Sequence, residues 1–385
     1  MSKRRKALEL LIVLTFLMII AVPLLFSDKT GGQVSESENR FLASAPTLFV
    51  GRKLNWQGGE LRTQVENWIN DNAYGRTRFK NMLSDFETAT LQMPRYDDLL
   101  YADDWVFLWR YDLPDRMLHT NLPSQSTLDS LLTKAQQIGQ EMERRGAAFS
   151  MTLHPHKADL CYGHLPATLH VAQETSLMDL YMQTFTGRED LIVSSSYDTM
   201  KQLRDAAPDP NVNSAYYAAY DASHWNRNGA FYGYLSQMEA IAASYPGVTY
   251  FDRDDYRIEP VSVTRTWYGR TYTEADTAFT LLPQRQAARN DSFFTDIGVT
   301  GLSDPWGVNR YYCVPDSDKP KALIIGDSYT WMYFIDDMAE SFSQMLYINV
   351  EDAASLWTLM DIYQPEVVSY AGINVANFLT GVPNP

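Results

Sequence analysis

The stretch KALIIGDSYT, at residues 321–330, constrains the fold of this chain more than any other. Residues 323–325 form a short apolar run typical of a buried strand, and the following GDS tripeptide is typical of a turn. Apolar side chains then recur at helical spacing over residues 331–342. The pattern predicts a strand, a sharp turn and a helix, with Ser328 where the strand gives way to the helix.

A serine at this position has its hydroxyl at the carboxyl edge of a sheet, beside helix N–H groups that can stabilise an oxyanion. The structural alternative is that Ser328 caps the helix and Asp327 complements its dipole. A second stretch, YDASHWNRNGAFYGY at residues 220–234, bears on this choice. A nucleophilic serine needs an imidazole to take its proton and a carboxylate to orient the imidazole. Asp221 and His224 supply both, although His224 alone also fits an ordinary half-buried histidine beside a core tryptophan.

The two motifs LIIGDSYT and DASHWNRNGA together resemble the SGNH-hydrolase-like domain of the alginate O-acetyltransferase AlgX/AlgJ group and the related DHHW family. Common SGNH esterases place the GDS block first, whereas here the Asp/His block precedes it, as in the permuted branch. Weaker similarities follow in the family's order over most of the chain after residue 35: ENR at 38–40, WINDNAYGR at 68–76, DDWVFL at 103–108, LHPHKADLCYGHLP at 153–166 and PEVVSYAGIN at 365–374. The implied fold is an SGNH-hydrolase-like, flavodoxin-like α/β fold with a parallel sheet, helices on both faces and permuted motif order.

The resemblance implies an enzyme that O-acetylates hydroxyls of a cell-surface or secreted polysaccharide through an acyl-enzyme. Ser328 is then the nucleophile, His224 the general base and Asp221 its orienting carboxylate, with no metal and no cofactor. The candidates for oxyanion or substrate binding lie in or beside the motifs: Gly326, Asn374, Lys157, Tyr329 and Trp225. The family's usual partner is a membrane-bound O-acyltransferase. A carbohydrate acetylesterase with the same triad and a catalytically inactive cell-surface protein of this fold are the alternatives.

The spacing of the Asp/His motif departs from the family. The family places one residue between the two, as D-x-H-W, whereas Ala222 lies two residues before His224 and the nearest acid is Asp221. Either Asp221 reaches the ring from one residue further back, or the orienting carboxylate is weakened or lost. Loss of this carboxylate costs roughly four orders of magnitude in turnover, so activity depends on this geometry.

The N-terminus carries four basic residues at positions 3–6, followed by an apolar run at 7–26 whose only charge is Glu9. About 20 apolar residues suffice to cross a bilayer, and the basic cluster then stays cytoplasmic. The alternative is a cleaved signal peptide, whose apolar core is shorter. The predicted organisation is a basic tail and transmembrane signal anchor at 1–27, an extracytoplasmic linker at 28–57, and an extracytoplasmic SGNH-like α/β domain at 58–385 with a Tyr-rich insertion around 244–318.

The net charge of the chain is −15, and because residues 1–27 contribute +3, residues 28–385 carry −18. Such a surface repels nucleic acid and anionic lipid headgroups. It also favours a neutral or cationic glycan over a strongly anionic one as the acceptor. We therefore expect no nucleic-acid partner, and membrane association through the N-terminal helix.

Cysteines and histidines leave two structural questions open. Cys161 and Cys313, the only cysteines, either pair in an oxidising compartment or act as small buried hydrophobes. His154, His156 and His164 lie close together in one loop, a spacing that invites a zinc site. Because no carboxylate or cysteine follows at a convincing metal spacing, we expect no metal there.

Helical and strand patterns alternate from Ser124 onward. The predicted elements are a helix at 124–146 capped by Ser124 or Ser126 and closed by Gly146, strands at 147–153 and 191–195, helices at 175–185 and 197–206, hairpin strands within 248–272, and strands at 345–350 and 366–370. Strands separated by helices of this length indicate a parallel sheet, with chemistry at the carboxyl ends of its strands.

Overall fold

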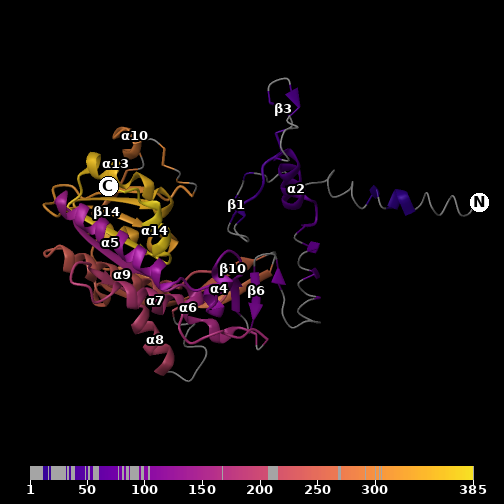
Figure 1. Ribbon diagram of the computed structural model, residues 1–385, viewed down its shortest axis with the longest axis horizontal. Helices are drawn as coiled ribbons and strands as arrows, with labels where there is room; N and C mark the ends of the chain where they lie inside the picture. Colours follow the sequence, from indigo (N-terminus) through magenta and orange to yellow (C-terminus); the bar gives the residue numbers. More distant parts are fainter. Residues whose placement is uncertain are drawn as a thin grey trace, which may run out of the picture. The chain divides into compact units, whose positions relative to one another are not determined.

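The structure is a computed structural model (Figure 1). It describes residues 12–15, 17–18, 32, 34–35, 40–47, 49–50, 53–54, 60–76, 78–79, 82–83, 86, 95–96, 99–102, 105–166, 168–206, 216–267, 270–290, 292–299, 301–302, 304 and 306–384. The chain divides into two units, residues 1–100 with 264–272 and residues 101–263 with 273–385.

The first unit contains a 13-residue helix, α2 (Glu60–Asn72), which ends at a turn where Gly75 adopts a φ of +75°. Short antiparallel strands accompany it: β1 (Val34–Ser35) pairs with β2 (Arg40–Phe41), β3 (Phe49–Val50) with β4 (Lys53–Leu54), and β5 (Arg95–Tyr96) with β6 (Leu99–Ala102).

The predicted signal anchor at residues 7–26 lies largely outside the described residues. Within the described part of the chain, no helix is both long enough and apolar enough to cross a membrane.

The second unit is built on a seven-stranded sheet with the order β12-β13-β15-β14-β16-β8-β9. The strands are β8 (Ala148–Leu153), β9 (Val193–Ser194), β12 (Ala288–Arg289), β13 (Arg310–Cys313), β14 (Lys321–Gly326), β15 (Gln344–Asn349) and β16 (Val367–Gly372). From β15 to β9 the neighbouring strands are parallel, as predicted. The expectation of a wholly parallel sheet is corrected at one edge, where β13 runs antiparallel to β15 and β12 antiparallel to β13.

The helices of the second unit connect and cover these strands. They are α4 (Leu113–Leu118), α5 (Gln125–Arg144), α6 (Lys157–Leu160), α7 (Leu177–Phe185), α8 (Tyr197–Ala206), α9 (Arg227–Ser244), α10 (Phe293–Asp296), α11 (Ser328–Trp331), α12 (Ile335–Ala339), α13 (Leu356–Tyr363) and α14 (Val375–Gly381). Directly before α5, Ser124 caps the helix by accepting a hydrogen bond from the Thr127 N–H (3.2 Å), and Gly146 follows the helix with a φ of +78°, as predicted.

Helices lie on both faces of the sheet. Gly139 of α5 packs against Phe149 of β8. On α9, the carbonyl of Ser236 accepts a hydrogen bond from the hydroxyl of Ser194 (2.7 Å), which in turn is bonded to Thr152 of β8 (3.0 Å). Because successive side chains of a strand point to opposite faces, Phe149 and Thr152 mark the two faces of β8. The predicted α/β layering is therefore confirmed for α5 and α9.

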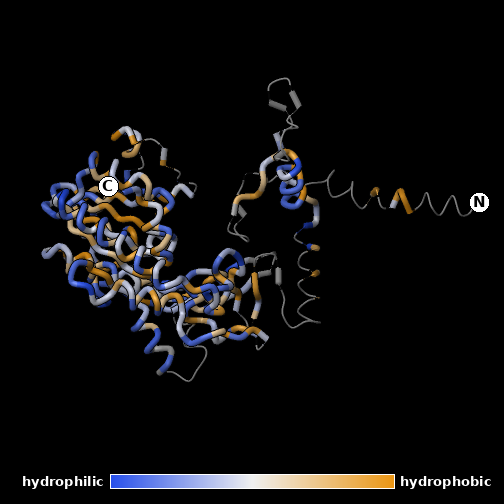
Figure 2. The backbone as a smooth tube through the Cα atoms, viewed as in Figure 1, coloured by the Kyte–Doolittle hydropathy of each residue, from blue (hydrophilic) through white to orange (hydrophobic). Residues whose placement is uncertain are grey.

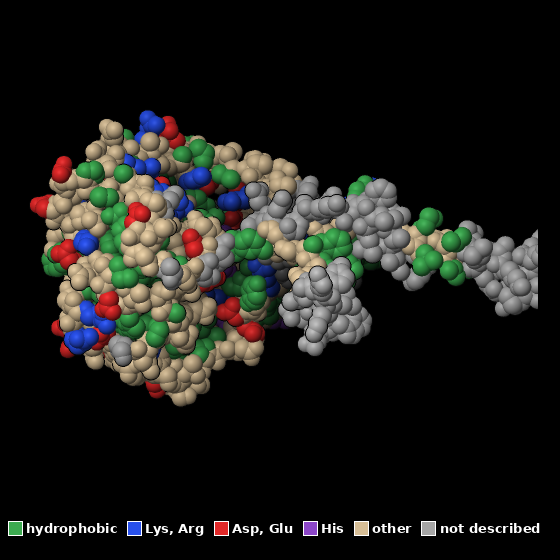
Figure 3. Space-filling view, turned by 90° about the horizontal axis from the view of Figure 1, so that it is seen from above, with side chains coloured by type: hydrophobic (Ala, Val, Ile, Leu, Met, Phe, Trp, Pro, Cys, Tyr) green, Lys and Arg blue, Asp and Glu red, His purple; other side chains and the backbone are tan. Residues whose placement is uncertain are grey.

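The core of the second unit follows from the apolar strands of this sheet. Figure 2 shows these strands as orange segments, with blue, hydrophilic residues on the outer turns of the surrounding helices. Residues 322–325 of β14 and 345–348 of β15 are all fully buried. On the face shown in Figure 3, acidic and basic side chains lie interspersed with apolar ones.

The segment after Ser328 is not one continuous helix. The predicted helix over 331–342 is divided into α11 and α12, because Phe334 leaves the helical conformation with φ and ψ of −109° and 13°. Its ring packs against Phe231 and Phe279, each with a centroid distance of 5.4 Å. Packing of this ring therefore overrides the helical spacing of the sequence.

Within the segment predicted as a Tyr-rich insertion, β10 (Tyr256–Trp267) and β11 (Arg270–Leu281) form a long two-stranded sheet, whereas β12 and β13 belong to the seven-stranded sheet. Two acidic residues of β11 form hydrogen bonds with the segment that carries His224. The Asp276 carboxylate accepts hydrogen bonds from the main-chain N–H of Arg227 (3.1 Å) and from its guanidinium (2.9 Å), and Glu274 accepts one from the Tyr220 N–H (3.1 Å).

Candidate active site

Ser328 lies directly beyond the carboxyl end of β14, at the first residue of α11, as the sequence predicts. Its side chain is half-buried. The helix cap is Asp327, whose carboxylate accepts a hydrogen bond from the Tyr329 N–H (3.0 Å). Ser328 is therefore not the capping residue of α11. Its hydroxyl is available for another partner.

Gly326 gives the turn before Ser328 its close approach to the neighbouring strand. A Cβ at this position would lie 2.5 Å from the hydroxyl of Thr330 and 2.8 Å from the carbonyl oxygen of Ala371 in β16. Because the second of these atoms belongs to the backbone of the sheet, no side chain fits without moving it. The structure thus gives Gly326 a packing role at the turn.

His224 and Ser328 are 104 residues apart in sequence and lie in hydrogen-bond contact. The distance from His224 Nε2 to Ser328 Oγ is 2.9 Å, and the distance from His224 Nδ1 to Asp221 Oδ1 is also 2.9 Å. A carboxylate only accepts hydrogen bonds, so Nδ1 carries the proton and Nε2 accepts from the serine hydroxyl. His224 is 8% exposed and Asp221 5% exposed, so the arrangement is largely shielded from water.

Asp221 reaches the imidazole despite its atypical spacing because its loop turns back on itself. The same oxygen, Oδ1, also accepts hydrogen bonds from the backbone N–H groups of Ser223 (3.1 Å) and His224 (2.9 Å). This turn places an acid three residues before the histidine beside its ring. The structure therefore brings together the three residues that the sequence assigned to a triad.

The Tyr329 ring packs between the imidazole of His224 and the ring of Trp225. The Tyr329 ring lies 5.5 Å from the His224 ring and 4.7 Å from the Trp225 ring, centroid to centroid. Trp225 is fully buried, and a Cβ at Gly233 of α9 would lie 2.0 Å from its ring. Both rings are in the core, so the expectation that they bind oxyanion or substrate does not match their position.

Lys157 is also buried, with an exposure of 0%. Its ammonium donates to backbone carbonyls, including those of Ala218 and Asp221, both at 2.7 Å. The expected substrate contact of Lys157 does not match this geometry, because its charged group is directed at the backbone that carries Asp221.

Asn374 lies at the carboxyl end of β16 and caps α14. Its side-chain oxygen accepts a hydrogen bond from the Asn377 N–H (3.3 Å), and the residue is half-buried. This is a structural role at the edge of the sheet where Ser328 also lies. The expected part of Asn374 in oxyanion binding stays a prediction.

From the sequence, Asp327 is expected only to complement the helix dipole, whereas in the structure its carboxylate joins two loops of the site. One carboxylate oxygen bonds the Tyr329 N–H, and the other accepts from the Ile373 N–H (2.8 Å), which ties the Ser328 turn to the loop after β16. Arg116 donates to the Ile373 carbonyl (2.8 Å). Burial of the carboxyl group raises the pKa of Asp327 to about 6. The hydrogen bond from the Ile373 N–H depends on tertiary structure, because Ile373 is 46 residues from Asp327 in sequence. No local sequence pattern therefore indicates it.

The three histidines of the loop after β8 have separate surroundings. His154 packs edge-on against Trp225 (4.9 Å), and burial lowers its pKa to about 3. His156 Nε2 is bonded to the Ser223 hydroxyl (2.9 Å), and His164 stacks on Trp105 (4.2 Å). Within the described residues, no group of three or more His, Cys, Asp or Glu side chains is arranged to hold a metal ion.

No disulfide joins the two cysteines; Cys161 is buried and Cys313 is partly exposed. Of the two possibilities that the sequence leaves open, the structure therefore has the one without a disulfide.

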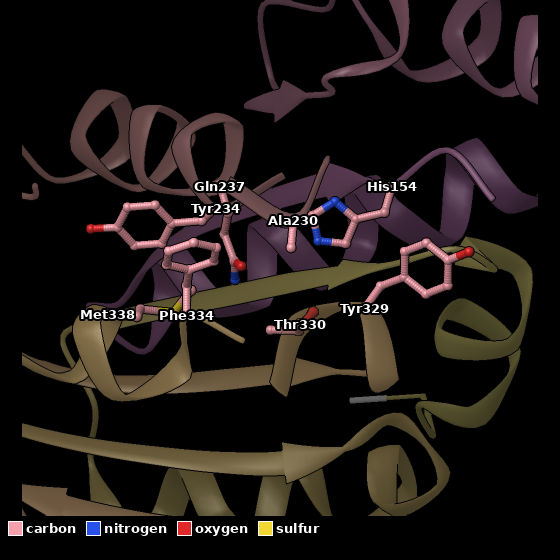
Figure 4. A pocket seen from close by; sticks show the side chains of 8 residues that line it. All are labelled: His154, Ala230, Tyr234, Gln237, Tyr329, Thr330, Phe334 and Met338. Carbon is pink, nitrogen blue, oxygen red and sulfur yellow. The ribbon is translucent and has the colours of Figure 1, made fainter. Parts of the chain in front are cut away.

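A small pocket lies on the core side of the residues that follow Ser328. It is lined by His154, Ala230, Tyr234, Gln237, Tyr329, Thr330, Phe334 and Met338 (Figure 4). Each of these residues is at most 5% exposed. The pocket is therefore part of the packed layer beneath α11 and offers no open entry for a polysaccharide.

Solved structures share this fold. PatB1 of Bacillus cereus matches with a TM-score of 0.50 and 14% identity, covering 73% of this chain and 96% of the PatB1 chain. A DHHW family protein from Eubacterium siraeum matches with a TM-score of 0.46 and 12% identity over 74% of this chain and 96% of that one. The O-acetyltransferase domain of Pseudomonas putida AlgJ matches with a TM-score of 0.38 and 14% identity over 74% and 94%.

At these identities the likeness concerns the fold. The resemblance drawn from the motifs is confirmed at that level. No protein-family model and no curated protein matches the chain.

Proposed function

We propose that this chain is an extracytoplasmic O-acetyltransferase of SGNH type that acetylates hydroxyls of a cell-surface or secreted polysaccharide. The observation that carries the proposal is the continuous hydrogen-bonded series Asp221–His224–Ser328, with both distances at 2.9 Å. A serine held in this way by a carboxylate-oriented imidazole is an activated nucleophile. That the acyl group is acetyl and the acceptor a polysaccharide is inferred from the resemblance of the motifs to the family.

The proposed reaction proceeds through an acetyl-serine. Ser328 Oγ attacks the carbonyl carbon of the acetyl donor while its proton moves to His224 Nε2. The bond to the leaving group then breaks, and His224 returns the proton to that group. In the second half, His224 takes the proton of an acceptor hydroxyl, whose oxygen attacks the acetyl-serine. As the bond to Ser328 Oγ breaks, His224 returns the proton to Oγ, which releases the acetylated sugar and free Ser328. Asp221 stabilises the imidazolium that forms in each half.

The developing oxyanion is assigned to the Ser328 N–H at the start of α11, with Asn374 as a second donor. Main-chain N–H groups at a helix start have no partner within the helix, so they suit this task. The neighbouring Tyr329 N–H is already bonded to Asp327. Ser328 itself thus supplies the nearest main-chain donor.

The acceptor is proposed to lie over the half-exposed aromatic residues that follow Ser328. Trp331 pairs with Arg310 (5.6 Å from the guanidinium carbon to the ring centroid), and Tyr333 pairs with Arg227 (5.4 Å). Such rings present flat apolar faces on which a pyranose can pack. The net charge of −18 on residues 28–385 favours a neutral or cationic glycan.

The N-terminal run at 7–26 is proposed to anchor the chain in the cell membrane. The catalytic unit then lies on the extracytoplasmic side. By resemblance, a membrane-bound O-acyltransferase is the partner that delivers acetyl groups to it.

Hydrolysis uses the same residues with water as the acceptor, so the experiment must separate transfer from hydrolysis. The full chain in detergent is incubated with a chromogenic acetyl ester, with and without candidate oligosaccharides, and the sugars are examined by mass spectrometry. We expect acetylated oligosaccharide with wild type and none with Ser328→Ala or His224→Ala. The matched control is Ser317→Ala, because Ser317 precedes the start of β14 and Ser328 follows its end. We expect this variant to acetylate the oligosaccharide as wild type does.

Acetate release with no sugar product would identify an esterase instead. No turnover by the folded wild type would favour the inactive cell-surface protein.

A further inference from the structure

Lys157 begins α6, directly after the loop that follows β8, and lies under the Asp221 segment. Its Nζ lies within hydrogen-bond distance of four backbone carbonyl oxygens, those of Ala218 (2.7 Å), Asp221 (2.7 Å), Val106 (2.8 Å) and Ala219 (3.1 Å), which share its three N–H donors. The side chain is 0% exposed. A single buried group thus binds the strand β7 (Trp105–Leu108) and the loop that leads to His224.

The surroundings of this nitrogen suit a cation. Carbonyl oxygens only accept hydrogen bonds, and an ammonium has three donors and no acceptor. The rings of Trp105 and Phe107 lie 4.8 Å and 5.0 Å from Nζ, and aromatic faces attract a cation. Because all of these groups are fixed by the backbone or the core, the ammonium has one well-defined position.

The main chain of Lys157 contacts the other half of the site. Its N–H donates to the hydroxyl of Tyr329, the residue next to Ser328 (3.2 Å), and that hydroxyl donates to the carbonyl of Ser223. The preceding residue, His156, adds a bond from Nε2 to the Ser223 hydroxyl (2.9 Å). Its other ring nitrogen accepts a backbone N–H (2.9 Å), so Nε2 is the protonated nitrogen.

We propose that Lys157 is a positioning residue for the triad. Its side chain fixes the carbonyl of Asp221, and its main chain fixes Tyr329 beside Ser328. Lys157 thus fixes the relative positions of two loops that are distant in sequence. Without the ammonium, buried carbonyls lose their donor and the Asp221 loop relaxes, which moves the carboxylate away from His224. The kinetic consequence of this rests on the proposed function, whereas the structural consequence does not.

The test is the proton resonance of His224 Nδ1, which lies far downfield when a carboxylate accepts from the imidazole. It is recorded on the full chain in detergent micelles with ¹⁵N-labelled histidine, and His224→Gln assigns it by its loss. We expect Lys157→Met to shift or abolish this resonance. The matched control is Lys321→Met, because Lys321 Nζ also donates to a carbonyl (Tyr363, 2.9 Å) and faces a ring (5.0 Å), but at the opposite end of β14.

An unchanged resonance in folded Lys157→Met would overturn the proposal. If that variant does not fold, Tyr329→Phe removes only the hydroxyl between Lys157 and Ser223, and the same shift is expected of it. An unchanged resonance in Tyr329→Phe would then overturn the proposal.

The kinetic readout is the division of the effect between kcat and KM. We expect kcat for the acetyl ester to fall by about 10²-fold in Lys157→Met, with KM within about twofold of wild type, because a displaced base slows chemistry without removing a substrate contact. A rise in KM at unchanged kcat would contradict positioning and favour direct substrate binding. Absence of turnover in wild type would defeat the proposed function alone, since the resonance still decides the role of Lys157.

Discussion

Asp221 uses one carboxylate oxygen for three N–H groups of its own loop, two from the backbone and one from the His224 ring. The backbone bonds fix the carboxylate before the imidazole is considered, so the ring meets a preorganised acceptor. This explains how a D-x-x-H spacing serves the purpose of the family's D-x-H. The extra residue is absorbed by the turn.

Replacement of this carboxylate by an amide tests its electrostatic part. Asp221→Asn keeps the size of the side chain and an oxygen that can accept the backbone bonds. It does not stabilise the imidazolium, so we expect kcat to fall by about 10³–10⁴-fold near neutral pH. Steady-state kinetics with an acetyl ester measures this, and a loss smaller than about tenfold would show that Asp221 is not the orienting group.

The raised pKa of Asp327 makes the stability of the folded chain depend on pH. Burial raises its pKa to about 6 in the folded chain, above the ordinary value near 3.9 of an unfolded aspartate. The folded state therefore binds the proton more tightly, and this contribution to stability is complete below about pH 4 and is lost as the pH rises through 6. We expect the unfolding free energy of wild type relative to Asp327→Asn to fall by roughly 2 kcal/mol between pH 4 and pH 7.

Chemical denaturation of both proteins across this range measures the difference, in which the other titrating groups largely cancel. A difference that stays constant or rises with pH would contradict the assignment of a raised pKa to Asp327.

The candidate site was predictable where local pattern carries the chemistry. Ser328 after an apolar strand, and Asp221 and His224 before an amphipathic helix, are visible in the sequence. The contacts of Lys157 and Asp327 were not predicted. Their partners, Asp221 and Ile373, are distant in sequence and contact them only in the folded chain. Tyr329 and Trp225 lie beside the motifs yet belong to the core, since adjacency in sequence does not determine which way a side chain points.

Helix α9 is positioned by the fit of a glycine to a tryptophan. Trp225 immediately follows His224, and Gly233 of α9 leaves the space that its ring occupies. A Cβ at Gly233 would lie 2.0 Å from the ring, so either the ring or the helix must move. Overpacking of this kind in a core costs about 1–3 kcal/mol.

We therefore expect Gly233→Ala to lower the unfolding free energy by about that amount and to lower kcat, because the displaced ring shifts His224. Gly163→Ala is the control, since a Cβ there has no neighbour within 4 Å. Thermal unfolding compares the two, and equal stability of the variants would contradict the tight fit.

Elements with strong local signals match their predictions. Helix α5, with its Ser124 cap, and strands β8, β14, β15 and β16 occur close to the expected positions. The antiparallel edge of β12 and β13 was missed, because strand direction is set by pairing partners and leaves no mark on a four-residue run. The break between α11 and α12 was missed because the Phe334 ring packs with residues of α9 and β11.

For the whole molecule, charge and the N-terminal run make a joint prediction. Residues 28–385 carry −18 and are repelled by anionic lipid, so association of the chain with a membrane requires an inserted segment. We expect the full chain to sediment with membranes and to stay there after high-salt and carbonate washes. A variant that begins at residue 28 should be soluble. Recovery of the full chain in the soluble fraction, or of a mature form cut near residue 27, would contradict the anchor.

In the proposed mechanism Ser328 carries the acyl group, and this acetyl-enzyme can be observed directly. The full chain is mixed with a reactive acetyl ester in the absence of acceptor, quenched in acid, digested and examined by mass spectrometry. We expect one added acetyl group on the peptide that contains Ser328. This acetyl group should be absent from Ser328→Ala, strongly reduced in His224→Ala and discharged when an accepting oligosaccharide is added before the quench. An unmodified Ser328 peptide in a protein that still turns over the ester, or an acetyl group on another residue that persists in Ser328→Ala, would contradict it.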